Sequence, residues 1–233
     1  MISLLPFSLK SKLILWLMVV ASTAHAQFRL FKGIDEIEIT GGVSSVSFMN
    51  ELYDEYTENK LGHRVGIGAG WEMNDKFSFC SGVFLERKGI DRHYTAKYYD
   101  VQVEDFRMGE VDENTNLDYV TVVLAVKFSL TKERNLFIES GPYSSYLFKA
   151  QSITQLSWQG KMAYDAKDYY KKFDFGFYLR VGYAIPSDRT WNLMIWSSYC
   201  HGLVDVTKED STTTAFHDVK NQALSVGLSF CFK

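Results

Sequence analysis

Proline is scarce in this chain, and of its three prolines only Pro142 and Pro186 lie beyond the first 26 residues. Because proline cannot donate to a sheet ladder, its scarcity leaves long stretches free to form strands. Long hydrophobic runs are also missing after residue 26, which excludes transmembrane helices of about 20 apolar residues there. Basic residues are not in excess, with 25 Lys and Arg against 28 Asp and Glu. The sequence therefore argues against a nucleic-acid partner, which requires a basic face.

Cysteine is scarce as well. Cys80, Cys200 and Cys231 are the three cysteines, and an odd number cannot all pair internally. All three fall on the strand parity that carries small residues, so we expect buried, unreactive thiols. A disulfide between two of them is the alternative.

The first 26 residues have the composition of an export signal. Lys10 and Lys12 precede an apolar core at 13–21 (LILWLMVVA), and residues 24–26 (AHA) form a small-x-small cleavage site. Nine apolar residues are too few for a spanning helix. We expect a cleaved signal peptide at 1–26, with a buried helix as the alternative. Its removal takes away two lysines and shifts the net charge from −3 to −5.

Large apolar residues alternate with small or polar residues through the remaining sequence. Between Leu224 and Phe232, for example, the large residues share one parity, and the small residues from Ala223 to Cys231 share the other. This alternation is typical of strands with one apolar face. It predicts eight strands, at 36–48, 61–73, 77–88, 117–130, 136–149, 173–185, 191–206 and 221–232.

The lengths of the connections between these strands also alternate. Connections 49–60, 89–116, 150–172 and 207–220 have 12, 28, 23 and 14 residues, whereas 74–76, 131–135 and 186–190 have three, five and five. Short turns at one rim and long loops at the other are typical of outer-membrane barrels. We therefore predict an all-β fold, an eight-stranded antiparallel transmembrane β-barrel at 36–233, after a short periplasmic segment at 27–35. A soluble barrel is the alternative.

Several motifs resemble a known family. Residues 81–89 (SGVFLERKG) resemble the strand ending G-x-x-[YF]-x-x-K-G of the Bacteroidota outer-membrane β-barrel family, the PorT-like or "porin family" group, which is similar in shape to OmpX and the OmpA barrel. Residues 117–120 (LDYV), 137–143 (FIESGPY) and 173–176 (FDFG) resemble later strands of this family. The resemblance implies an integral protein of a Gram-negative outer membrane, in contact with lipopolysaccharide and, during insertion, with the barrel-assembly machinery. It implies no activity.

Charged residues on the inward parity are placed to pair. The turn at 74–76 sets Arg64 opposite Glu86, and the turn at 131–135 sets Lys127 opposite Glu139. Arg180, on the next strand, can reach the Glu139 carboxylate or a tryptophan across its own hairpin. Because an unpaired interior charge is costly, we expect a structural plug of ion pairs. A narrow pore or proton path is the alternative.

The two longest loops carry opposite charge. Loop 89–116 has seven acids and three bases, whereas loop 150–172 has four lysines and two aspartates. We expect the two loops to pack together as an extracellular cap. Exposed aromatic residues often mark partner-binding surfaces. The candidates in the second loop are Trp158, Tyr164, Tyr169 and Tyr170.

No motif for catalysis or for a cofactor emerges. Residues 112–116 resemble the start of a calcium loop, but Leu117 and Val123 occupy the positions where an EF-hand needs Gly and Glu. The sequence therefore predicts neither an enzyme nor a metal or cofactor site. A weak divalent-ion or lipopolysaccharide-bridging site in loop 89–116 is the alternative. It predicts a structural or interaction role through loops 89–116 and 150–172. The alternatives are a narrow transport pore and a PorT-like accessory factor in protein secretion, and the expected partner is an extracellular or secretion-system protein.

Overall fold

The computed structural model describes residues 33–49, 57–100, 104–187, 190–208 and 219–232. The expected signal peptide at 1–26 lies outside these residues. Within the described ranges, no helix is both long enough and apolar enough to cross a membrane.

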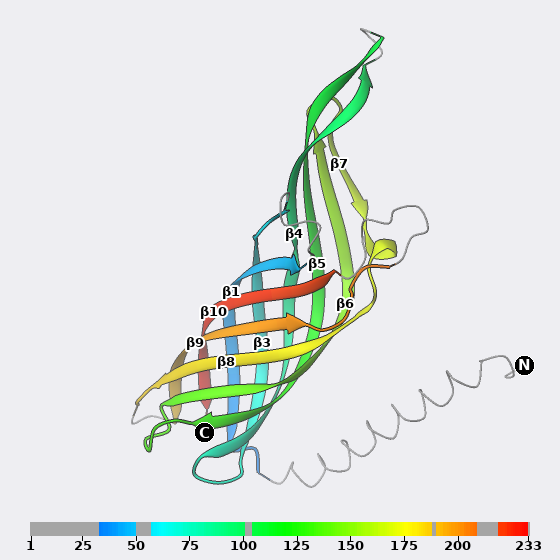
Figure 1. Ribbon diagram of the computed structural model, residues 1–233. Coiled ribbons are helices and arrows are strands. Elements are labelled where there is room, and N and C mark those ends of the chain that lie inside the picture. Colours follow the sequence, from blue (N-terminus) through cyan, green and yellow to red (C-terminus); the bar gives the residue numbers. More distant parts are fainter. Residues whose placement is uncertain (1–32, 50–56, 101–103, 188–189, 209–218, 233) are drawn as a thin grey trace, which may run out of the picture. The chain divides into compact units, whose positions relative to one another are not determined.

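Eight long strands form a closed antiparallel ring. Strands that follow one another around the ring pair in chain order, and β1 pairs with β10 to close it (Figure 1). Closure leaves the ring without a free edge. The strands are β1 (Glu36–Met49), β3 (Lys60–Glu72), β4 (Phe77–Asp100), β5 (Asp105–Ser129), β6 (Leu136–Leu156), β8 (Phe173–Ile185), β9 (Trp191–Gly202) and β10 (Lys220–Phe232). The predicted eight-stranded antiparallel barrel is confirmed.

Three short elements complete the described structure. Strand β2 (Thr57–Glu58) pairs with β4, and β7 (Gly160–Asp165) pairs with β6. A 3₁₀ helix, η1 (Lys167–Tyr169), follows β7.

The segments expected to be loops at 89–116 and 150–172 are largely strands, so this part of the prediction was wrong. The β4–β5 ladder continues to the pair Asp100–Asp105, and β6 runs on to Leu156 before it turns into β7. We call the part of β4–β7 that lies beyond Asp91 of β4 and Gln151 of β6 the projecting sheet, because it extends past the ring at the long-loop end (Figure 1). Water bathes both faces of much of this sheet, so its sequence lacks the apolar alternation of the barrel wall.

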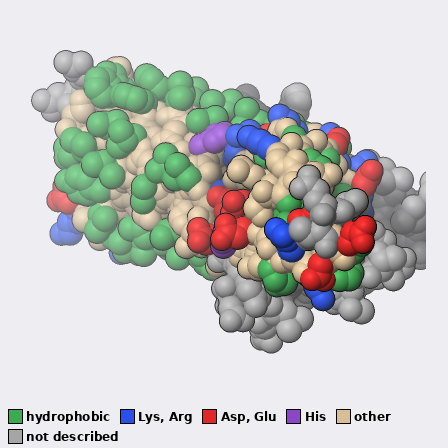
Figure 2. Space-filling view, turned by 90° about the horizontal axis from the view of Figure 1, so that it is seen from above, with side chains coloured by type: hydrophobic (Ala, Val, Ile, Leu, Met, Phe, Trp, Pro, Cys, Tyr) green, Lys and Arg blue, Asp and Glu red, His purple; other side chains and the backbone are tan. Residues whose placement is uncertain are grey.

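The outer surface of the ring is apolar, as the alternation predicts. In β10, Leu228 is 49% exposed, whereas the neighbouring Ser229 is fully buried. Aromatic pairs lie near the two ends of this apolar surface, with Trp191 against Phe230 near the short turns and Tyr146 against Phe173 near the long loops. In Figure 2, hydrophobic side chains cover one part of the outer surface, and acidic and basic side chains gather on another. An apolar band between aromatic girdles is the surface that a barrel presents to lipid.

Inside the ring, aromatic side chains lie over glycines of the neighbouring strand. The pairs are Phe84 with Gly66, Phe137 with Gly182, Tyr143 with Gly176 and Trp196 with Gly227. A Cβ added at Gly42 would lie only 2.7 Å from Trp196 Cη2. Glycine is therefore the residue that lets large rings fill a narrow eight-stranded lumen. The three cysteines are free and point inward, as expected.

Candidate functional site

The middle of the lumen holds a buried ion pair between neighbouring strands. Arg64 of β3 lies opposite Glu86 of β4 in the register, and Arg64 Nη1 is 3.0 Å from Glu86 Oε1. Thr121 donates a hydrogen bond to Glu86 Oε2 at 2.9 Å. The Arg64 guanidinium also lies over the Phe84 ring, 3.7 Å from its centroid. Both charges are thus compensated in an environment that excludes water.

Arg180 of β8 joins two carboxylates in the layer nearer the short turns. Its Nη2 donates to Glu38 Oε1 at 2.6 Å, and its Nη1 donates to Glu139 Oε2 at 3.4 Å. Nη2 also donates to Ser229 Oγ at 3.0 Å, and the guanidinium lies 5.1 Å from the centroid of Trp196. Glu38 was not predicted from the sequence, because it lies on β1, which β9 and β10 separate from β8 in the ring.

Lys127 forms a different ion pair from the one expected. It lies opposite Glu139 in the β5–β6 register, but its Nζ donates to Glu36 Oε1 at 2.9 Å. Arg180 already approaches Glu139 from the other neighbouring strand. The ammonium of Lys127 therefore turns across the lumen to a carboxylate of β1.

A third buried cluster, near the long-loop end, was missed from the sequence. Asp174 of β8 has no exposed surface and accepts hydrogen bonds on Oδ2 from Lys88 Nζ at 3.0 Å, Asn221 Nδ2 at 3.0 Å and the Tyr143 hydroxyl at 3.3 Å. Lys88 Nζ also lies 3.7 Å from Glu86, which links this cluster to the middle layer. Lys88 and Asp174 are on strands that are not neighbours, so no turn length indicates the pair. Their shared inward parity is the only sequence signal.

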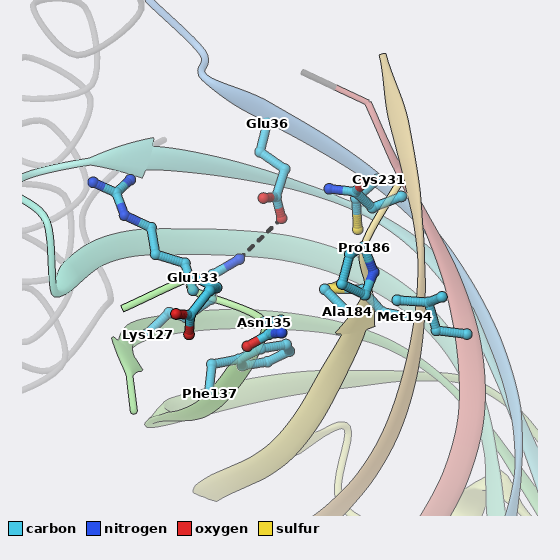
Figure 3. A pocket seen from close by; sticks show the side chains of 12 residues that line it. Glu36, Lys127, Glu133, Asn135, Phe137, Ala184, Pro186, Met194 and Cys231 are labelled. Carbon is cyan, nitrogen blue, oxygen red and sulfur yellow. Dashed lines mark hydrogen bonds and ion pairs between the residues drawn. The ribbon is translucent and has the colours of Figure 1, made fainter. Parts of the chain in front are cut away.

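Among the residues that the structure describes, the lumen is hollowed at the end of the short turns. A pocket of about 200 Å³ there is lined by Phe137, Met194 and Cys231 and by the Glu36–Lys127 pair (Figure 3). The next cavity inward, beside Arg180, measures about 20 Å³, which is room for roughly one water molecule. The layer of Arg180 and its carboxylates thus closes the lumen beyond the pocket.

An apolar cluster closes the long-loop end, and we call it the cap. Tyr170 and Val206 are 6% and 0% exposed, and they pack with Val219 against inward residues of the ring. A bridge between Tyr170 and Thr207 joins the two chain segments. Burial raises the pKa of Tyr170 to about 12. The cap is therefore formed by residues 166–170, 205–207 and 219. Segments 89–116 and 150–172 do pack on each other, as the charge pattern suggested, but they do so as neighbouring strands of the projecting sheet.

Asp205 organises the backbone of the cap. Its Oδ1 accepts hydrogen bonds from the Thr207 amide at 3.0 Å, the Thr207 hydroxyl at 2.8 Å and the Val219 amide at 3.1 Å, and its Oδ2 accepts one from Lys171 at 3.0 Å. Burial acts to raise the pKa of Asp205, but these hydrogen bonds outweigh burial and hold the pKa below its ordinary value of 3.8. A carboxyl group with a lowered pKa stabilises the folded state above its ordinary pKa, and this contribution is lost as the pH falls through the folded-state value.

Removing the Asp205 carboxylate is expected to loosen the cap. In Asp205→Ala at pH 7, the amides of Thr207 and Val219 should exchange with deuterium roughly fivefold faster, as follows from a lost hydrogen bond of about 1 kcal/mol. Wild-type protein should show the same acceleration only below about pH 4. Asp168→Ala, on the exposed surface of η1, is the matched control and should leave the exchange rates unchanged. Equal exchange in wild type and Asp205→Ala would contradict this role.

The four aromatic residues predicted as a binding surface have different environments. Tyr164 and Tyr169 are 43% and 54% exposed, and their ring centroids are 6.3 Å apart. Trp158 stacks on Tyr98 of β4 with ring centroids 4.2 Å apart. Tyr170 is buried in the cap, so its assignment to an exposed surface was wrong.

Three solved structures of outer-membrane proteins are similar to this chain. Ail, the attachment invasion locus protein of Yersinia pestis, is 11% identical, with 84% of this chain and 98% of Ail covered at a TM-score of 0.41. Neisserial surface protein A is 12% identical, and the match covers 83% of this chain and 95% of that protein at a TM-score of 0.42. The N-terminal barrel domain of Pseudomonas aeruginosa OprF is 10% identical, and the match covers 86% of this chain and 100% of that domain at a TM-score of 0.32. No curated protein matches this chain.

The family comparison identifies the family, because the family model matches well over half of the sequence. Residues 26–208 match the family model described as outer membrane protein beta-barrel domain. This range includes the first seven strands of the ring and the projecting sheet. The protein therefore belongs to the outer membrane protein beta-barrel domain family.

Proposed function

We propose that this protein is a closed outer-membrane barrel that acts as an interaction protein at the cell surface, with the projecting sheet as its binding element. The observation that carries the proposal is the contrast between the two parts of the molecule. The lumen is blocked by buried ion pairs and by the cap, whereas strands of the wall continue well beyond the ring. A transporter needs a lumen that opens, while a surface-binding protein needs a rigid element outside the membrane.

The projecting sheet is built as a rigid platform. The β4–β5 ladder is unbroken from Phe77–Phe128 in the wall to Asp100–Asp105 at the tip. Stacking of Trp158 on Tyr98 ties the β6–β7 turn to β4. Near the tip, Phe106 and Met108 are 58% and 65% exposed. Because the long connections of outer-membrane barrels are extracellular and the short turns periplasmic, this apolar tip would stand outside the cell.

Trimming the projecting sheet is expected to abolish function without unfolding the barrel. In the trimmed variant, an Asn-Gly turn replaces residues 94–111 between β4 and β5, and a second one replaces 153–163 between β6 and β7. Cap and ring stay intact, so heat-modifiable migration on gels should match that of wild type. In a strain that lacks the gene, expression of the wild-type protein should correct the deletion phenotype, and expression of the trimmed variant should not. Full complementation by the trimmed variant would refute the proposal.

We also propose a finer family assignment, to the Bacteroidota PorT-like group, and we consider two alternative functions, a secretion accessory factor and a narrow pore. The motif at 81–89 supports placement in the Bacteroidota PorT-like group, and its last residue, Gly89, adopts a φ of 141°, a value that favours glycine. That group suggests an accessory role in protein secretion, which normal cargo secretion in a deletion strain would exclude. The pocket at the short-turn end is compatible with a narrow pore, which conductance measurements would detect. The other proposed partners are lipopolysaccharide in the membrane and the barrel-assembly machinery during insertion.

A further inference from the structure

Strand β7 leaves one edge of the projecting sheet unpaired. It pairs with β6 along its whole length, and no strand in the described part of the chain pairs with its other edge. All six of its residues, Gly160–Asp165, are exposed. An open edge offers a row of backbone donors and acceptors to any extended chain.

The register identifies which backbone groups point outward. The Ala166 amide donates to the Ala150 carbonyl at 3.1 Å, so these two residues form a hydrogen-bonded pair. Hydrogen-bonded and non-hydrogen-bonded pairs alternate along an antiparallel ladder. Tyr164 and Met162 therefore direct their amides and carbonyls to β6. Lys161, Ala163 and Asp165 direct theirs to the open edge.

The side chains around this edge define what kind of strand it would accept. Lys161 and Asp165 lie on one face with the small Ala163 between them, and Met162 and Tyr164, each 43% exposed, lie on the other. A strand added antiparallel would place a base opposite Asp165 and an acid opposite Lys161. Between them it would place a small residue opposite Ala163 and apolar residues opposite Met162 and Tyr164.

A second copy of this chain would match the same charge pattern, but it does not fit. Antiparallel pairing of two β7 strands would turn the second barrel upside down. Ala163 lies level with Asp91 of β4 through the ladder, and β4 continues nine residues beyond Asp91, or about 30 Å. Only four residues separate Asp91 from Arg87, where the outward apolar side chains of β4 end, or about 13 Å. The tip of the second copy would thus enter the membrane of the first.

We propose that the open edge of β7 binds an extended segment of another protein as an added antiparallel strand. From its N-terminal to its C-terminal end, the segment has the alternation basic, apolar, small, apolar, acidic. Backbone hydrogen bonds to Lys161, Ala163 and Asp165 supply the affinity, and the alternating side chains supply selectivity. This inference rests on the proposed function, because it names the partner chemistry of the projecting sheet.

The test uses the full-length protein in nanodiscs and the synthetic peptide Thr-Lys-Val-Thr-Val-Glu-Thr as the probe. Titration should shift the amide resonances of Lys161, Ala163 and Asp165. Ala163→Pro removes one outward amide without removing a bond to β6, and it should weaken binding at least tenfold. Ala163→Ser keeps the amide and should bind like wild type. The double variant Lys161→Glu/Asp165→Lys leaves the backbone unchanged and should prefer the peptide with its Lys and Glu exchanged.

The outcomes separate this inference from the proposed function. Equal peptide binding by wild type and Ala163→Pro would overturn the proposal that a strand is added to β7. Unchanged amide resonances of β7 during the titration would overturn it as well. An unchanged peptide preference in the double charge variant would also overturn it, even if Ala163→Pro failed to fold. In the deletion strain, failure of both Ala163→Pro and the trimmed variant to correct the deletion phenotype supports the inference. If only the trimmed variant fails to complement, β7 is ruled out as the contact and the proposed function still holds. Full complementation by the trimmed variant refutes the proposed function.

Discussion

Replacing Asp174 by asparagine is expected to destabilise the barrel by about 3–5 kcal/mol, because it leaves a buried charge without its partner. Asp174 is fully buried and is the closest anion to Lys88 Nζ, at 3.0 Å. In the variant, the Lys88 ammonium and the Arg64 guanidinium would share the single carboxylate of Glu86, which lies 3.7 Å from Lys88 and 3.0 Å from Arg64. The lumen would then hold an uncompensated positive charge.

Urea unfolding in lipid vesicles, followed by tryptophan fluorescence, measures this loss. The matched variant Lys88→Met/Asp174→Leu removes both charges, and it should recover most of the stability, since replacing a buried ion pair by apolar residues is often neutral. Asp118→Asn on the outer face is the control, because its partner Arg87 is 36% exposed and exposed pairs contribute about 0–1 kcal/mol. A neutral effect of Asp174→Asn would contradict the buried pair.

Leu228→Arg is expected to cost about 2–4 kcal/mol, the range for arginine on the lipid face near the middle of a bilayer. Leu228 faces outward at the centre of β10, where it lies opposite Gly41 and Ile195. Ser229→Arg should destabilise by a different route, because Ser229 is buried and contacts Arg180 and Glu38.

Changing the surrounding medium separates the two routes. The cost of Leu228→Arg should shrink in detergent micelles, where the side chain reaches water easily, whereas the cost of Ser229→Arg should stay the same. Leu228→Ala is the control for lost side-chain volume. Equal responses of Leu228→Arg and Ser229→Arg to the change of medium would contradict the assigned facing of β10.

The barrel itself could be predicted because the bilayer imposes a regular pattern on the wall. Lipid requires large apolar residues outward, and the narrow lumen requires small or paired polar residues inward, so every wall strand carries the same alternation. The bounds of β8 agree with the prediction at both ends. The Arg64–Glu86 register could also be inferred, because a short turn fixes which residues lie opposite each other across a hairpin.

The projecting sheet could not be predicted from the same pattern. Beyond Asp91, the β4–β5 ladder is held by backbone hydrogen bonds, and polar side chains such as Glu110 and Asp112 face water. Such a stretch has the composition of a loop. The pairs Lys88–Asp174 and Lys127–Glu36 join strands that are not neighbours, and their geometry depends on the curvature of the closed ring. The cap was missed because Tyr170 lies in a connection that carries no strand pattern, and because Val206 was assigned to the wall strand at 191–206, which in the structure ends at Gly202.

The central claim is that the lumen is closed and that the protein acts through its extracellular sheet. Single-channel recording of the purified full-length barrel in planar bilayers tests this most directly. With the ion-pair layers and the cap in place, we expect no stable openings and no passage of sugars or antibiotics. Large, long-lived conductance steps from the wild-type protein would contradict a closed barrel and would favour a transport pore.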